Sequence, residues 1–117
     1  MDRDALIYGL TVMVENFKES SEMKLAALAN EGIDGETLGS AKNHLDFING
    51  CVNLQELLEY DDGDSFDGLK PYLKFIKDDT TPKLFRKDLE DVINDCPDFN
   101  AEEKVEVVNE IIKLVFE

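Results

Sequence analysis

Residues 35–60 place apolar side chains at helical spacing over an unusually wide arc. On a helical wheel of about 100° per residue, the apolar positions cover roughly 200°. They are Leu38, Ala41, Leu45, Phe47, Ile48, Cys51, Val52, Leu54 and Leu58. A surface helix needs an apolar stripe of only about 100°. The pattern therefore predicts a central helix with neighbours on more than one side, with Leu45 and Ile48 in the core and Asp34 as its N-cap.

One dipeptide inside this stretch supports a different structure. Asn49-Gly50 lies between two apolar runs, which is a strong cue for a β-hairpin. A milder alternative ends one helix at Gly50 and starts another at Asn53, with Glu56 in capping-box spacing. The long helical pattern on both sides favours a helix, either intact or broken at this point.

The segment before this stretch also has helical periodicity. A first helix is predicted from about Asp4, and it either continues to Asn30 or restarts near Ser21. Gly32 suits the position just after its end. Because terminal helices pack on fewer sides, Leu6 is expected to contribute less to stability than Leu45.

Two shorter helices are predicted next. One covers residues 69–76, with Pro71 tolerated in its first turn. The other begins after Thr81 as N-cap, with Pro82 at the first helical position, and Pro97 ends it.

The last segment opens with Asn100 and Glu103 in capping-box spacing. Its expected apolar stripe is Val105, Val108, Ile111, Ile112 and Val115. These residues are mostly β-branched, so a terminal strand remains the alternative. The whole pattern predicts a single all-α domain over residues 1–117, a compact bundle of about five antiparallel helices around residues 35–60.

Length and composition narrow the class of protein. A chain of 117 residues can bury a core without disulfides or metals. Cys51 and Cys96 both fall on apolar faces and are expected to be buried small hydrophobes. No stretch approaches the roughly 20 apolar residues of a membrane span, and the start, Met1-Asp2-Arg3-Asp4, does not resemble a signal peptide. These features favour a cytoplasmic protein that does not enter a membrane.

The net charge of −15 is unevenly distributed. Residues 35–67 contain eight acids against the single base Lys42, and residues 88–117 contain ten acids against two lysines. Only residues 68–87 are basic, with six bases against two acids. Such a charge repels phosphate backbones and attracts basic surfaces, so the sequence predicts a basic protein partner and no direct binding of nucleic acid.

A group of acids follows the end of the expected central helix. It consists of Glu56, Glu59, Asp61, Asp62, Asp64 and Asp67. Acids at a helix carboxyl end are unfavourable because the helix dipole is already negative there. This local cost predicts a partner-binding site, although a solvated loop, or a loop neutralised by the basic segment 70–87, would have the same sequence.

No catalytic or metal-binding motif is present. The acidic loop beginning at Asp61 does not fit the ligand spacing of an EF-hand, and phosphate-binding, dinucleotide-binding and zinc-protease motifs are absent. His44, the only histidine, lies seven residues before Cys51, too far along one helix for a nucleophile–base pair. The sequence predicts neither an enzyme nor a bound metal or cofactor.

Two kinds of function are compatible with these patterns. The first is an acidic binding module that covers a basic, nucleic-acid-binding surface of a partner, as inhibitors, immunity proteins and phage-encoded nucleic-acid mimics do. The second is a helical adaptor or chaperone that binds through apolar helix faces. Its sequence basis is the apolar end at residues 111–116, through which a homodimer is a further expectation.

Overall fold

Every regular element in the described part of the chain is a helix. The computed structural model describes residues 3–30, 35–59 and 66–117. Within them lie α1 (Arg3–Leu28), α2 (Gly35–Glu59), the 3₁₀ turn η1 (Phe66–Leu69), α3 (Lys70–Asp79), α4 (Pro82–Asn94) and α5 (Ala101–Phe116). The predicted all-α bundle is confirmed. The caps predicted at Gly32 and Asp34 lie outside the described residues.

α2 runs without interruption through Asn49-Gly50, so neither the hairpin nor the broken helix is present. The glycine has another role, because α3 packs very closely on α2 at this point. A Cβ atom at Gly50 would lie 2.7 Å from Cγ of Phe75. Phe75 also packs edge-to-face on Phe47, with ring centroids 5.0 Å apart. Gly50 therefore allows a close approach between two helices rather than a turn.

The predicted helix starts after residue 80 are confirmed in detail. The Thr81 side chain accepts a hydrogen bond from the Leu84 N–H, and Pro82 opens α4. Asn100 and Glu103 form a reciprocal capping box at the start of α5, with distances of 2.8 and 3.1 Å. These caps satisfy backbone N–H groups that have no partner within the helix. The terminal segment is accordingly a helix and not a strand.

α1 is one continuous helix, and it packs on α2, α4 and α5. Gly9 lets α5 approach, because a Cβ atom there would lie 2.6 Å from Cγ1 of Val107. Leu6 is only 5% exposed, whereas Leu45 is 47% exposed. The expectation that Leu6 is the less important core residue is therefore wrong. The amino half of α1 packs on α4 and α5, so Leu6 belongs to the core and not to a loosely packed terminus.

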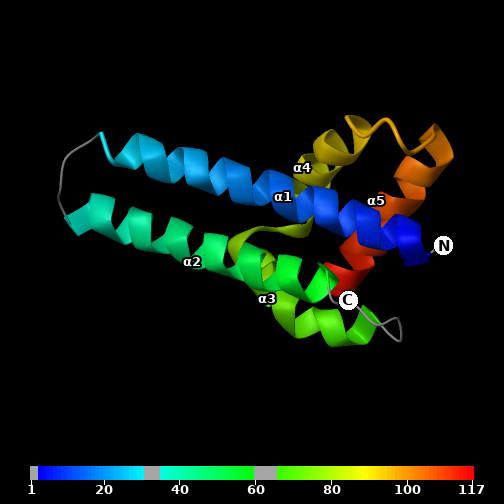
Figure 1. Cartoon of the computed structure of the whole chain (residues 1–117), viewed down its shortest axis with the longest axis horizontal. Coiled ribbons are helices and arrows are strands. Elements are labelled where there is room, and N and C mark those ends of the chain that lie inside the picture. The colour runs from blue at the N-terminus through cyan, green and yellow to red at the C-terminus, as the bar shows by residue number, and fades with distance from the viewer. Residues whose placement is uncertain (1–2, 31–34, 60–65) are drawn as a thin grey trace.

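The far ends of α1 and α2 extend beyond the other helices as an antiparallel pair (Figure 1). We call residues 22–28 and 35–46 the arm. No residue of the arm is buried, whereas the remainder of both helices contributes to the core. The molecule is correspondingly elongated, with extents of 47 × 27 × 23 Å. The arm is a two-helix projection from a five-helix base.

The wide apolar arc of α2 is two separate faces. The inner face carries Phe47, Cys51, Leu54 and Leu58, which pack on the core. The outer face carries Leu38, Ala41, Leu45, Ile48 and Val52, none of which belongs to the core cluster. On a helical wheel the two faces are centred roughly 130° apart. The carboxyl half of α2 packs on the core with α1 and α3 as its neighbours, whereas α1 and α5 each pack on three helices. The core positions predicted at Leu45 and Ile48 are wrong.

The buried stripe of α5 also differs from the prediction. Val105 is 62% exposed, while Val107 and Leu114 are buried. α5 packs on α1, α3 and α4, and these three contacts rotate the buried face away from Val105. Ile111 and Val115 are buried as predicted. Most of the apolar side chains of α5 are buried inside the protein. The homodimer through this helix stays a prediction.

Candidate functional site

The structure describes part of the predicted acidic site. Glu56 and Glu59 are exposed on the last turns of α2. Asp67 lies in η1, and its side chain is not described. Asp61, Asp62 and Asp64 lie outside the described residues. The structure therefore places two of the six acids on one helix end, and the remaining four stay a prediction.

Glu56 and Glu59 have no compensating charge within the part of the chain that the structure describes. The last turn of α2 contains no basic residue, and no ion pair joins either glutamate to a described side chain. Each exposed acid near a helix carboxyl end costs about 0.3–1 kcal/mol. Their placement lowers the stability of the protein, which a contact with a basic partner would offset.

The basic segment 70–87 uses at least two of its charges locally. Lys74 forms an ion pair with Asp78 at 2.9 Å. Arg86 lies 3.7 Å from Glu90 and donates a hydrogen bond to Asn109 at 3.2 Å. These side chains are committed to residues on α3, α4 and α5. They do not neutralise the two glutamates at the end of α2.

The outer face of α2 leads directly to these two glutamates. Its apolar residues lie within an arc of roughly 80°, and Glu56 and Glu59 continue the same arc one and two turns further on. Leu38 and Leu45 are 57% and 47% exposed, and none of the described segments covers them. This helix face is apolar from Leu38 to Val52 and acidic at its end. Sequence periodicity detected its residues but assigned the apolar ones to the core.

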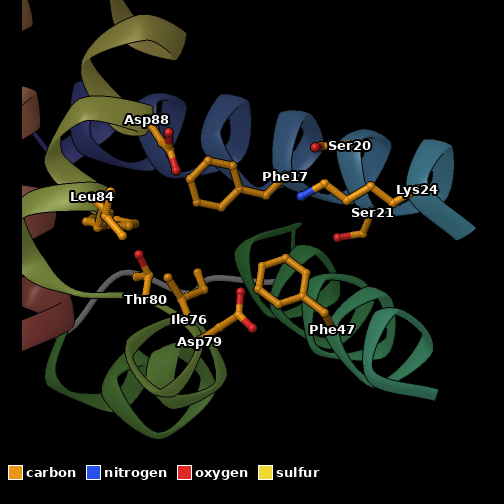
Figure 2. Close-up of a pocket in the computed structure, with 11 residues that line it drawn as sticks. Phe17, Ser20, Ser21, Lys24, Phe47, Ile76, Asp79, Thr80, Leu84 and Asp88 are labelled. Atoms are coloured by element: carbon orange, nitrogen blue, oxygen red, sulfur yellow. The ribbon is translucent and has the colours of Figure 1, made fainter. Parts of the chain in front are cut away.

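A cleft of about 240 Å³ opens at the base of the arm, between α1, α2 and the α3–α4 junction (Figure 2). Its apolar wall is formed by Phe17, Phe47, Ile76, Leu84 and Phe85, and its polar residues are Ser20, Ser21, Lys24, Asp79, Thr80 and Asp88. No sequence pattern indicates this cleft. Its residues come from four helices, and only tertiary packing brings them together.

Both cysteines are buried, and the one histidine is half-buried. Cys51 is buried on α2, and burial raises the pKa of its thiol to about 12, so the unreactive protonated form dominates near neutral pH. Cys96 is buried beyond the end of α4. His44 is half-buried on α2. Over the described ranges, no group of three or more His, Cys, Asp or Glu side chains is arranged to hold a metal ion.

Cys96 instead belongs to a structural hydrogen-bond chain. Its thiol donates to the Tyr8 hydroxyl at 3.5 Å, and that hydroxyl donates to Asp98 Oδ2 at 2.6 Å. The bond to the Asp98 carboxylate is the main cause of a raised pKa of Tyr8, because it favours the protonated phenol. Phe99 packs edge-to-face on the Tyr8 ring at 5.4 Å. Together these contacts fasten the α4–α5 loop to α1.

Comparison with protein-family models, with curated proteins and with solved structures finds no match. Function must therefore be inferred from the surfaces just described. Of the helices in the described segments, none is both long and apolar enough to cross a lipid bilayer.

Proposed function

We propose that this protein is a non-enzymatic binding module that docks on a basic partner protein through the outer face of α2. The observation that supports this function best is the continuity of that face, from exposed Leu38 and Leu45 to the unpaired Glu56 and Glu59. Protein interfaces combine a desolvated apolar centre with a polar, solvent-accessible rim. The exposed part of α2 offers both.

The two parts of the face have different roles in the proposed complex. Apolar side chains at i, i+3, i+7, i+10 and i+14 suit an amphipathic helix laid along α2. They would set the dissociation rate, because most of the buried area lies there. The acidic end, supported by a net charge of −15, would set the association rate by attracting basic residues.

Within this class, the proposed role is that of an inhibitor, an immunity protein or a nucleic-acid mimic that covers a basic surface. Some nucleic-acid mimics of this class are encoded by phages. The second candidate, a helical adaptor or chaperone, is favoured by the same exposed Leu38 and Leu45. Salt separates the two, because electrostatic capture weakens steeply with ionic strength and apolar docking does not.

The test uses paired variants in affinity capture from the source cell. Leu38→Ser/Leu45→Ser removes apolar area from the outer face, and Tyr72→Ser/Val105→Ser removes exposed apolar area elsewhere. A partner that binds the outer face is retained by the second variant and lost by the first. Capture that is equal for both variants would contradict the proposal.

The charge requirement is tested on the captured partner by association kinetics. Glu56→Lys/Glu59→Lys should slow association about tenfold or more at low salt, the scale of electrostatic steering. Glu15→Lys/Glu19→Lys makes the same charge change on exposed α1 residues and should have a much smaller effect. Slower association with the α1 pair alone would move the site from α2 to α1. If neither pair slowed association, the acidic residues between Asp88 and Glu110 would be tested next.

A further inference from the structure

We propose that the cleft at the base of the arm binds an organic cation of side-chain size, with a guanidinium or ammonium group on an apolar stem. This inference does not depend on the proposed docking face, because the cleft lies on other surfaces of α1 and α2 and includes residues of α3 and α4.

The size of the cleft limits the ligand. Its volume of about 240 Å³ is below the roughly 300–1,000 Å³ of pockets that hold drug-sized molecules. One long side chain, or a free molecule of similar size, fits that volume. The apolar wall includes Ile76 and Phe85, which are almost completely buried, so the floor is a fixed part of the core.

Two aromatic rings suit the stem and the charge of such a ligand. Phe17 is held edge-to-face against Phe85 at 6.0 Å, and Phe47 against Phe75 at 5.0 Å. Both Phe17 and Phe47 are half-buried and line the cleft from opposite sides (Figure 2). A guanidinium group stacks well on an aromatic face, and the attraction increases when the site is partly desolvated.

The charges around the cleft favour a cation. The carboxylate of Asp88 points toward the Phe17 ring, and that of Asp79 points toward Phe47 (Figure 2). Neither carboxylate forms an ion pair with any side chain in the described ranges. The cleft residues therefore contain two acids against one base, Lys24, and the protein as a whole is strongly acidic. Asp79 also lies at the carboxyl end of α3, where the helix dipole is negative.

The effect of replacing Lys24 distinguishes a cationic ligand from an anionic one. Its long side chain extends into the cleft from α1 (Figure 2). If the ligand is a cation, Lys24 competes with it electrostatically and must swing aside. If the ligand were a carboxylate with an apolar tail, Lys24 would anchor it. Replacement of Lys24 thus has opposite effects in the two cases.

The experiment is a titration of the ¹⁵N-labelled protein followed by NMR. Butylguanidinium is the cationic probe, and hexanoate is an anionic probe of similar size. Butylguanidinium should cause saturable shifts at the amides of Ser21, Thr80 and Asp88, with little effect from hexanoate. Asp79→Asn/Asp88→Asn should weaken this binding about three- to tenfold, as expected for the loss of two partly exposed charge contacts. The matched control is Asp91→Asn/Asp95→Asn, in which Asp91 is exposed on α4 and Asp95 is the exposed C-cap of α4. This control should change the affinity for butylguanidinium less than twofold.

Lys24→Met supplies the second comparison and should tighten butylguanidinium binding. Hexanoate binding that is lost in Lys24→Met would overturn the proposal, and so would an absence of saturable shifts at the cleft amides. N-acetyl-arginine methylamide then distinguishes the sources of the cation. Binding at least as tight as that of butylguanidinium indicates an arginine side chain of a protein, whereas weaker binding indicates a free small molecule.

Discussion

At the scale of single residues, two glycines determine how closely the helices pack. Gly9 and Gly50 are both inside helices, where glycine is unfavourable by about 0.5–1 kcal/mol relative to alanine. Both are required because a neighbouring side chain occupies the place of a Cβ atom. The dipeptide Asn49-Gly50 is typical of a turn, and the neighbouring sequence gives no sign that Phe75 packs against Gly50. Tertiary packing thus overrides the local cue.

Gly9→Ala should destabilise the protein, and Gly39→Ala should stabilise it. The new methyl group at position 9 meets Val107 and Ile111, and overpacking of this kind costs about 1–3 kcal/mol. A Cβ atom at position 39 meets nothing within 4 Å, so the higher helix propensity of alanine should add about 0.5–1 kcal/mol. Urea denaturation of the two variants measures both changes. Equal effects at both positions would show that α1 and α5 are not closely packed at Gly9.

At the scale of helices, the sequence predicts where a helix begins better than it predicts which of its side chains are buried. Local chemistry decides where α4 and α5 begin, and Thr81, Pro82 and Asn100 are sufficient to place those starts. Burial depends on neighbours that a helical wheel does not show. The periodicity of α2 predicts its apolar arc correctly, but a helical wheel does not show that only inner residues such as Phe47 and Leu54 belong to the core.

Leu45→Ala and Leu54→Ala separate the two faces of α2. Leu54 is fully buried, so its truncation should cost about 2–5 kcal/mol. Leu45 is exposed on the outer face, and its truncation should change stability by no more than about 0.5 kcal/mol. Both changes replace leucine by alanine in the same helix, so propensity effects cancel. A loss at Leu45 close to that at Leu54 would place the outer face in a contact within the protein.

At the scale of the whole molecule, acidic repulsion is the dominant electrostatic feature. The ion pairs that the described segments contain are exposed and join residues three or four apart in the same helix. Such pairs contribute little to stability. Because an ion pair carries no net charge, the whole net charge of −15 remains beside these pairs. The distribution of charge and the exposure of Glu56 and Glu59 were predictable from sequence, and their role in binding stays a prediction. The cleft and the outer face required the packing of the helices.

Added salt should therefore raise the thermal stability of the free protein. Raising the NaCl concentration from about 20 mM to about 500 mM shortens the range of the repulsion between carboxylates. A gain of about 1 kcal/mol corresponds to a rise in melting temperature of roughly 4–8 °C for a domain near this size. Glu15→Lys/Glu19→Lys makes the net charge less negative, so the rise in melting temperature with salt should be smaller for this variant. A melting temperature that falls with salt would mean that attractive charge pairs dominate.

The arm gives the molecule two levels of stability. Its two helices pack on each other, its least exposed side chains, such as Leu25, Leu28 and His44, are only half-buried, and none of its side chains belongs to the core. The arm can therefore open locally at a lower free energy than the base requires for unfolding. If the proposed partner binds only the arm with α1 packed on α2, part of its binding free energy is used to hold the two helices together. Residues between the two helices would then change the affinity without touching the partner, while the core stays the same.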